Sequence, residues 1–405
     1  MEQGRGLCCL GSAVKLRPPA LLLPIIYLGF ISLGLPDGTL GVAWPRMHRD
    51  LGLPIGVAGV FVVVATLLAA VAGFSSGRLI ARWRTAPLVI GSCALTGLGL
   101  LVVARAEGLP WLMLAAVPLG LGAGAVDAAL NGYVARHYEA RHMNWLHACW
   151  GIGATCGPLV LAQAMATSWG WRGGFVTLGL VQLSLAALFL STLRLWSQVP
   201  ERAVGAGAPA PATAKGVSRP TAIANSPAGW LSVLIFMLYT AVEGTAGVWA
   251  ASILVEARGV AAPVAGLCAA GFYASITLGR IGVGFVVERL GNRRLITLGL
   301  IITAAGVALF IVGRPIAVAA TALVLLGLGF APIYPCLMHE VPRRFAPEAV
   351  QTIIGRQSGS GAAGSATLPA AAGLLAFYSL ELIPWAIAAG LTLLILAIRQ
   401  LNRIT

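Results

Sequence analysis

The sequence predicts an all-α membrane protein with twelve transmembrane helices, arranged as two six-helix parallel repeats. Three observations lead to this fold class. The 405 residues are 58% hydrophobic and only 10% charged, whereas soluble domains carry about 25% charged residues. Apolar runs of the roughly 20 residues that a membrane-spanning helix needs recur along the whole chain. The second half also repeats elements of the first. Together these features exclude an ordinary soluble enzyme.

The apolar runs divide into six spans on each side of a polar stretch. We expect the spans at residues 21–45, 54–77, 86–106, 110–135, 145–167 and 173–194, and then at 227–252, 263–287, 294–312, 315–338, 352–378 and 381–399. The stretch between them is rich in Ala, Pro, Gly and Ser, so it buries little apolar area. We therefore expect an N-terminal half (1–196), a flexible cytoplasmic linker (197–226) and a C-terminal half (227–405).

The internal repeat rests on four matches at one offset. The segment Asp37–Val42 in the first span matches Glu243–Val248 in the seventh, 206 residues later. Three further matches lie at an offset of 207: Val57-Ala58-Gly59 with Val264-Ala265-Gly266, Gly77 and Arg82 with Gly284 and Arg289, and Leu119–Gly122 with Leu326–Gly329. Because six is an even number, both copies enter the membrane in the same direction, which predicts a parallel repeat about an axis along the membrane normal.

The positive charges predict the orientation. If both termini are cytoplasmic, that side carries 19 of the 27 Lys and Arg residues and the opposite loops carry 6. Membrane proteins keep positive loops in the cytoplasm, so we expect a multi-pass protein of the inner membrane whose basic residues face anionic lipid rather than nucleic acid. The seven cysteines show no disulfide framework and no metal-ligand spacing. We expect a monomer without metal or cofactor.

Three acidic residues, Asp37, Asp127 and Glu243, fall deep within spans 1, 4 and 7. A charge at the centre of a membrane helix costs roughly 2.5 to 3.5 kcal/mol, so each should face a water-filled cavity or a partner. A carboxyl group in such a cavity can bind a proton from one side and release it to the other, which makes the three acids candidates for proton coupling. The alternatives are a capping acid at the Pro36 kink for Asp37 and a structural hydrogen-bonded acid for Asp127.

Other polar and aromatic residues in the spans are candidates for substrate binding. Asn131 lies one helical turn after Asp127 and shares its face, although amides also join neighbouring helices. Arg280 either pairs with Glu243 or binds an anionic substrate. Trp44 and Trp249 either stack on a sugar or belong to the interfacial aromatic belt. His147 is either a proton relay or a packed histidine. Further cavity candidates are Trp150, Gln163, Tyr273 and Tyr334.

The segment from Gly284 to Arg294 resembles the signature loop of the major facilitator superfamily, with a glycine, an acid–arginine pair, a second glycine and a basic pair. The N-half copy, Gly77 to Arg84, lacks the acid and the second glycine. In that family the loop latches neighbouring helices in the outward-facing state. The resemblance thus implies the major facilitator fold, a transporter rather than an enzyme, and a gating role for Gly284, Glu288, Arg289, Gly291, Arg293 and Arg294.

A narrower resemblance points to the fucose permease and sugar:proton symporter branch. It rests on Asp37 in a Pro-Asp-Gly setting, on Asp127 with Asn131, and on Asn144-Trp-Leu-His147 before a Gly-rich helix. That branch typically has glutamate where this chain has Asp127. The resemblance implies proton-coupled symport of a small polar, sugar-like solute by alternating access. One alternative is proton-coupled efflux of drugs or metabolites, because Gly153-x-x-x-Gly157-Pro158 is similar to half of a drug-antiporter motif. Another is a non-transporting sensor.

Overall fold

The structure is a computed structural model that describes residues 21–37, 39–54, 57–197, 224–376 and 378–405. The first twenty residues and most of the expected linker (198–223) lie outside the described part. Within the described ranges every regular element is a helix and no strand occurs.

The N-terminal half contains the six expected spans, the first of them in two pieces. Leu35, Pro36 and Asp37 separate the two pieces, and proline there removes a backbone donor from the helix. A short helix, α8, follows the sixth span. The helices are α1 (Leu22–Gly34), α2 (Thr39–Asp50), α3 (Val57–Trp83), α4 (Thr85–Ala104), α5 (Leu109–His137), α6 (Ala140–Met165), α7 (Gly170–Ser191) and α8 (Leu193–Ser197).

The C-terminal half repeats this arrangement, but the break falls in its fourth span, at Ala331 and Pro332. Its first span continues into one turn of π-helix, η1, and a short 3-10 turn, η2, precedes the last span. The elements are α10 (Pro227–Ser252), η1 (Ile253–Ala257), α11 (Ala262–Leu290), α12 (Asn292–Val312), α13 (Ile316–Phe330), α14 (Ile333–Arg344), α15 (Pro347–Ala376), η2 (Leu380–Leu382) and α16 (Ile383–Ile404).

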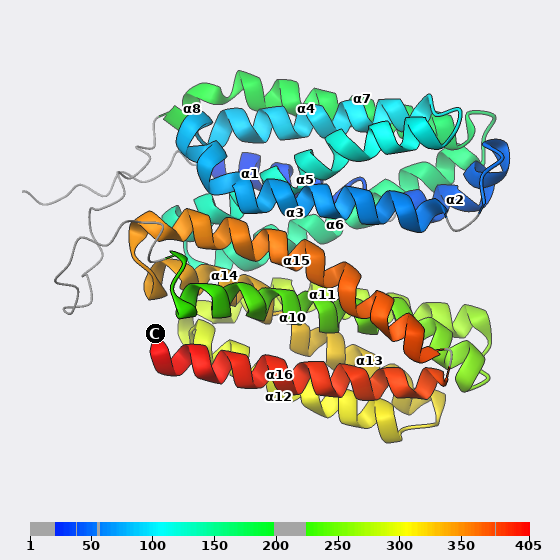
Figure 1. Cartoon of the computed structure of the whole chain (residues 1–405), viewed down its shortest axis with the longest axis vertical. Coiled ribbons are helices and arrows are strands. Elements are labelled where there is room, and N and C mark those ends of the chain that lie inside the picture. Colours follow the sequence, from blue (N-terminus) through cyan, green and yellow to red (C-terminus); the bar gives the residue numbers. More distant parts are fainter. Residues whose placement is uncertain (1–20, 38, 55–56, 198–223, 377) are drawn as a thin grey trace, which may run out of the picture.

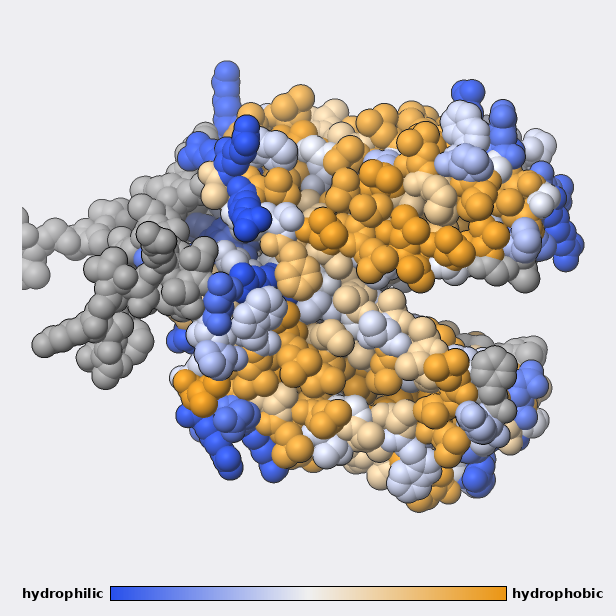
Figure 2. Space-filling model, in the orientation of Figure 1, coloured by the Kyte–Doolittle hydropathy of each residue, from blue (hydrophilic) through white to orange (hydrophobic). Residues whose placement is uncertain are grey.

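Ten spans of the described residues are long and apolar enough to cross a membrane. Two expected spans fall outside this set for chemical reasons. The first is broken into α1 and α2, and α15 carries many Gly and Ser residues together with Arg356 and Gln357. With these two, the described residues supply the twelve membrane-spanning segments that the sequence predicts. Figure 2 shows hydrophobic residues covering the middle of both halves and hydrophilic residues gathered at the two ends.

The two halves lie one above the other and meet mainly through α3 against α15 and α6 against α11 (Figure 1). Glycines permit this close approach. A side chain at Gly73 would collide with the backbone of Gly359, and one at Gly284 would collide with the Trp145 indole. Figure 2 shows that the halves are in contact at the end that carries the C-terminus and separated by a cleft at the opposite end.

Candidate substrate and proton site

Asp37 lies at the break in the first span and is exposed. Thr39 closes the break by donating its hydroxyl to the Pro36 carbonyl at 2.6 Å. The Trp150 indole nitrogen on α6 donates to the Asp37 carboxylate at 2.7 Å. The carboxylate therefore has a neutral hydrogen-bond donor and remains accessible, because the break removes the helix turn that would otherwise cover it.

Asp127 begins a chain of polar side chains that leads from α5 to α6. The Asn131 amide nitrogen donates to the Asp127 carboxylate at 2.9 Å, and the Asn131 amide oxygen lies 3.1 Å from Nε2 of the buried His147. Asp127 itself is half-buried. Asp37 and Asp127 are thus the two acids within the spans of this half, each held by a neutral hydrogen-bond donor.

Glu243 and Arg280 form an ion pair in the C-terminal half, with a 3.5 Å separation between Oε1 and Nη2. Both side chains are largely buried, with exposed fractions of 19% and 6%. The Arg280 guanidinium also lies 5.9 Å from the centre of the Trp150 ring. Trp150 therefore stands between the Asp37 carboxylate of one half and the Arg280 cation of the other.

Tyr334 completes the polar layer from the C-terminal side. Its ring lies edge-on to His147, with a 4.7 Å centroid separation, and edge-on to Phe236 at 4.9 Å. The buried Ser358 on α15 lies close to both Asp127 and Tyr334. The sequence did not single out Ser358, because one serine in a helix rich in Gly and Ser carries no distinguishing signal.

The remaining sequence-predicted residues are dispersed. Trp249 donates its indole N–H to the Pro369 carbonyl at 2.9 Å, which joins α10 to α15. Tyr273 is half exposed and packs against Phe272. Gln163 is exposed near the end of α6. Trp44 is 5% exposed and lies in the packed core of the N-terminal half, so it belongs to packing rather than to the polar layer.

The model of the family described as "Major Facilitator Superfamily" matches residues 26–249 and 231–402. The chain belongs to the major facilitator superfamily. It is therefore a multi-pass membrane transporter and not an enzyme. An uncharacterized MFS-type transporter of Yersinia pestis is 25% identical over 369 residues, which cover 87% of this chain and 84% of that protein. A mouse facilitated glucose transporter, member 10 of solute carrier family 2, is 29% identical over 40% of this chain and 31% of its own length.

Solved structures share the superfamily fold at low identity. The transporter FucP in the outward conformation has a TM-score of 0.73 and 14% identity, with 93% of this chain and 98% of that chain covered. The human organic anion transporter MFSD10 has a TM-score of 0.72 and 15% identity, with 94% and 98% covered. At these identities the likeness establishes the fold alone.

The signature loop of the superfamily contributes to the contact between the halves. The Arg141 backbone N–H on α6 donates to the Glu288 carboxylate at 3.1 Å, and the Trp145 indole donates to the Ile281 carbonyl beside Gly284. Gly291 has φ of +80°, a conformation that favours glycine, and this turn redirects the chain from α11 into α12. Arg289 and Arg294 are exposed.

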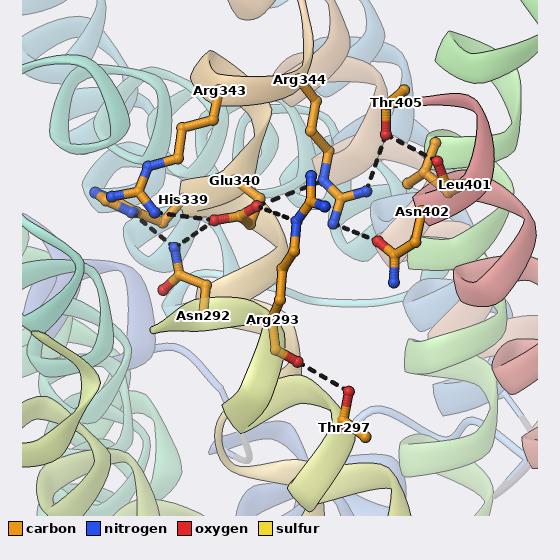
Figure 3. Close-up of polar contacts among 10 residues, drawn as sticks. All are labelled: Asn292, Arg293, Thr297, His339, Glu340, Arg343, Arg344, Leu401, Asn402 and Thr405. Atoms are coloured by element: carbon orange, nitrogen blue, oxygen red, sulfur yellow. Dashed lines mark hydrogen bonds and ion pairs between the residues drawn. The ribbon is translucent and has the colours of Figure 1, made fainter. Parts of the chain in front are cut away.

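Arg293 belongs to a second cluster within the C-terminal half (Figure 3). The buried Glu340 carboxylate accepts from Asn292 at 2.9 Å and pairs with Arg293 at 3.3 Å, with Arg343 at 3.1 Å and with Arg344 at 3.7 Å. This cluster ties α12 to α14 at the closed end of the cleft. Of the basic pair of the loop, Arg293 thus belongs to this cluster, whereas Arg294 is exposed.

The half motif of drug antiporters has a packing role in α6. A side chain at Gly153 would collide with the Ile31 carbonyl, and one at Gly157 with the Leu35 carbonyl. Both glycines thus let α6 lie directly against α1. This close packing accounts for the glycine spacing without reference to the direction of transport.

Proposed function

We propose that this transporter couples proton movement to the transport of a small polar, sugar-like solute by alternating access. The proposal rests on the hydrogen-bond partners of the two acids within the spans of the N-terminal half. Asp37 is bonded to the Trp150 indole and Asp127 to the Asn131 amide, and neither forms an ion pair with any basic residue of the described ranges. A carboxyl group held only by neutral donors is free to exchange a proton when the cleft changes sides.

Glu243 has a different role in this mechanism. Its charge is balanced by Arg280 at 3.5 Å, so it gives up its ionised state only if that pair opens. We assign proton binding to Asp37 and Asp127, with Glu243 as a carboxylate coupled to them through Arg280 and Trp150. A proton entering down a potential of 100 mV releases roughly 2.3 kcal/mol, which is enough to concentrate a neutral solute roughly fifty-fold.

Alternating access would proceed by rocking of the two halves about this layer. With both termini in the cytoplasm of an inner membrane, the cleft in the structure opens outward and the closed end is cytoplasmic. Glu288 with Arg141, and Gly284 with Trp145, would then separate as the cleft opens inward. We propose that a single chain suffices, because each half brings its own residues to the layer.

The sugar-like class draws support from the chemistry of the layer and from the neighbours. Carboxylates, an amide and the Trp150 indole suit a solute with several hydroxyl groups. Among the solved structures of this fold, one is titled as a fucose:proton symporter of E. coli and another as a proton:xylose symporter. The mouse relative is named as a facilitated glucose transporter.

The test begins with a thermal-shift screen of purified protein against sugars, organic acids and drugs at two pH values. The solute found is then used for uptake into proteoliposomes. Asp127→Asn should abolish uptake driven by a pH gradient but preserve solute exchange, because the amide no longer carries a proton. Asp50→Asn is the matched control, since Asp50 lies at the end of α2, away from the layer. Full concentrative uptake by Asp127→Asn would refute the proposal.

A further inference from the structure

A cavity of about 370 Å³ extends from Asp37 into the interior of the N-terminal half. We call this space the N-half chamber. Its walls come from the ends of α1 and α2, from α3, α4 and α5, from one phenylalanine of α7, and from two small residues of α15. Asp37 is one of its lining residues, and Phe61, Leu100 and Leu119 are typical of the rest. The chamber is thus continuous with the proposed proton site.

Most residues that line the chamber are apolar, and most of the hydroxyl groups among them already donate hydrogen bonds within the chain. Thr39 donates to the Pro36 carbonyl, Thr96 to the Ser92 carbonyl and Ser365 to the Ala362 carbonyl. Ser32 donates to the Gln182 side chain. These four hydroxyls donate their protons within the chain and keep only acceptor capacity, so a sugar ring placed there would replace few of the hydrogen bonds that it makes to water, which is costly. Asp37 is the one charged residue among the described lining residues.

The internal repeat shows why this space is open. At positions 207 residues further along, aromatic rings replace small side chains of the chamber, and Phe272, Tyr273 and Phe330 form a packed cluster with centroid separations of 5.1 Å and 6.3 Å. Phe272 and Phe330 are fully buried. The N-half residues at these three positions are Ala65, Thr66 and Ala123, all of which line the chamber.

Protein interiors are normally packed to crystal-like density, and an unfilled cavity lowers stability in proportion to its volume. One half of the molecule fills this region with its own rings, and the other leaves it open beside an accessible carboxylate. The space also far exceeds the roughly 30 Å³ that one water molecule occupies in the liquid. An open apolar space beside an accessible carboxylate is what a binding pocket for an apolar group requires.

We propose that the transported solute is amphipathic: a compact apolar group, such as a phenyl ring, fills the N-half chamber while its polar part is held at Asp37 and Trp150. This inference rests on the proposed function for the location of the polar part and narrows its substrate class. The chamber is then a specificity pocket that favours solutes carrying an apolar group over the corresponding wholly polar ones.

The test uses matched pairs of probes that differ by one phenyl group: D-glucose and phenyl β-D-glucoside, acetate and phenylacetate, and methylamine and benzylamine. Binding to the purified full-length chain is followed by tryptophan fluorescence, because the Trp150 indole donates to Asp37, which lines the chamber. In at least one pair the phenyl member should bind at least about tenfold more tightly, as expected for burial of an aromatic ring. The three chemical classes keep the test independent of whether the polar part is a sugar.

The decisive variants introduce, at two chamber positions, the aromatic residues that the C-terminal half has at the corresponding positions. Ala123→Phe and, independently, Thr66→Tyr should remove the tenfold advantage and leave the affinity of the parent probe unchanged. Val117→Phe is the matched control, because Val117 lies on the same helix, is 41% exposed and is outside the lining.

Three results would overturn the proposal: no gain from the phenyl group in any pair, a gain that survives both filling variants, or a lipid acyl chain that mass spectrometry finds held in the chamber of the wild type but not of Ala123→Phe. Failure of the proposed function has a separate signature, since concentrative uptake by Asp127→Asn does not alter the comparison of probe pairs.

Discussion

The two halves of the molecule share a scaffold but differ in what they hold within it. Gly120 packs against the Ala65 carbonyl, and Gly327, 207 residues later, packs against the Phe272 carbonyl. In each half the second and fourth spans approach each other at this glycine. The backbone contact is the same in both, although the facing residue is Ala65 in one half and Phe272 in the other. The backbone contact is preserved because any side chain at that glycine would collide, whereas the facing residue is constrained only by the volume available.

The charged residues within the spans differ more between the two halves than the helix packing does. Asp37 corresponds to Glu243, yet Asp37 accepts from a neutral indole and Glu243 pairs with Arg280. Asp127 corresponds to Tyr334, which cannot replace it as a carboxylate. The N-terminal half thus carries carboxylates held by neutral donors, to which we assign proton binding in the proposed mechanism, whereas the C-terminal half carries an ion pair and aromatic rings.

The largest effect should come from breaking that ion pair. Arg280→Gln leaves the Glu243 charge buried and unpaired, which should lower the free energy of unfolding by about 3 to 5 kcal/mol. Asp37→Asn should cost only about 0.5 to 1.5 kcal/mol, because Trp150 can still donate to the amide oxygen. Thermal unfolding of the purified variants measures both.

The double variant Arg280→Gln with Glu243→Gln is the control for this experiment, and it should recover most of the lost stability because no charge remains buried. If the double variant is as unstable as Arg280→Gln alone, or if Asp37→Asn is equally destabilised, the contrast between a fixed pair and a free acid fails.

The sequence predicts the twelve spans and the duplication because insertion in a bilayer requires local apolar runs, which are readable one segment at a time. It also identifies Asp37, Asp127 and Arg280 as unusual, since charges at membrane depth are rare. The sequence does not show which face of each helix is turned toward the core. Trp44 was expected at a sugar or in the interfacial belt, yet α2 turns it into the core at 5% exposure.

Partnerships between distant helices are hidden from the sequence for the same reason. The bond between His147 and Asn131 and the approach of Ser358 to Asp127 depend on which faces of α5, α6 and α15 meet. The sequence alone does not predict the chamber either, because the space results from three small residues that lie on two different helices. The repeat makes it apparent only once the structure shows that the equivalent rings touch.

A second comparison concerns arginines that cap helices at the open end of the cleft. In the N-terminal half Arg172 donates to the Ala104 and Ala106 carbonyls at 3.0 Å and 2.8 Å. In the C-terminal half Arg258 donates to the Phe310 and Gly313 carbonyls at 2.8 Å and 3.1 Å. The two arginines come from different spans but serve the corresponding helix ends, α4 and α12.

Arg258 should contribute the more to stability. Its side chain is 2% exposed and also makes a two-pronged contact with Glu381, whereas Arg172 is exposed and has no carboxylate partner among the described residues. We expect Arg258→Gln to lower the free energy of unfolding by about 2 to 4 kcal/mol and Arg172→Gln by about 0.5 to 1.5 kcal/mol. Thermal unfolding again measures the difference.

Arg314→Gln separates the capping effect from the ion pair, because Arg314 binds the same Glu381 carboxylate but is 64% exposed. It should cost less than about 1 kcal/mol. Equal losses from Arg314→Gln and Arg258→Gln would show that burial and carbonyl capping add nothing at this end of the molecule.

The smallest expected effect concerns the exposed carboxylate of Asp50 at the end of α2. The Trp171 indole N–H donates to Asp50 at 2.8 Å and, with Arg46 nearby, holds the pKa of Asp50 below its ordinary value of 3.8. At the offset of 206 that applies to this span the corresponding residue is Glu256, and among the described residues no indole donates to it. A pKa lower in the folded than in the unfolded chain stabilises the fold above the ordinary value, and this contribution is lost as the pH falls through the lowered one.

Because Asp50 is well exposed, solvent screening limits its contribution to a few tenths of a kcal/mol. The measurement is the difference in unfolding midpoint between the wild type and Asp50→Asn, followed from pH 7 down to about pH 3. We expect the wild type to be slightly more stable at pH 7 and the difference to shrink as the pH falls below the ordinary pKa of 3.8. A difference that stays constant with pH would mean that Trp171 holds residue 50 through packing and a neutral hydrogen bond, and the asymmetry between the halves would then be one of shape rather than of charge at this position.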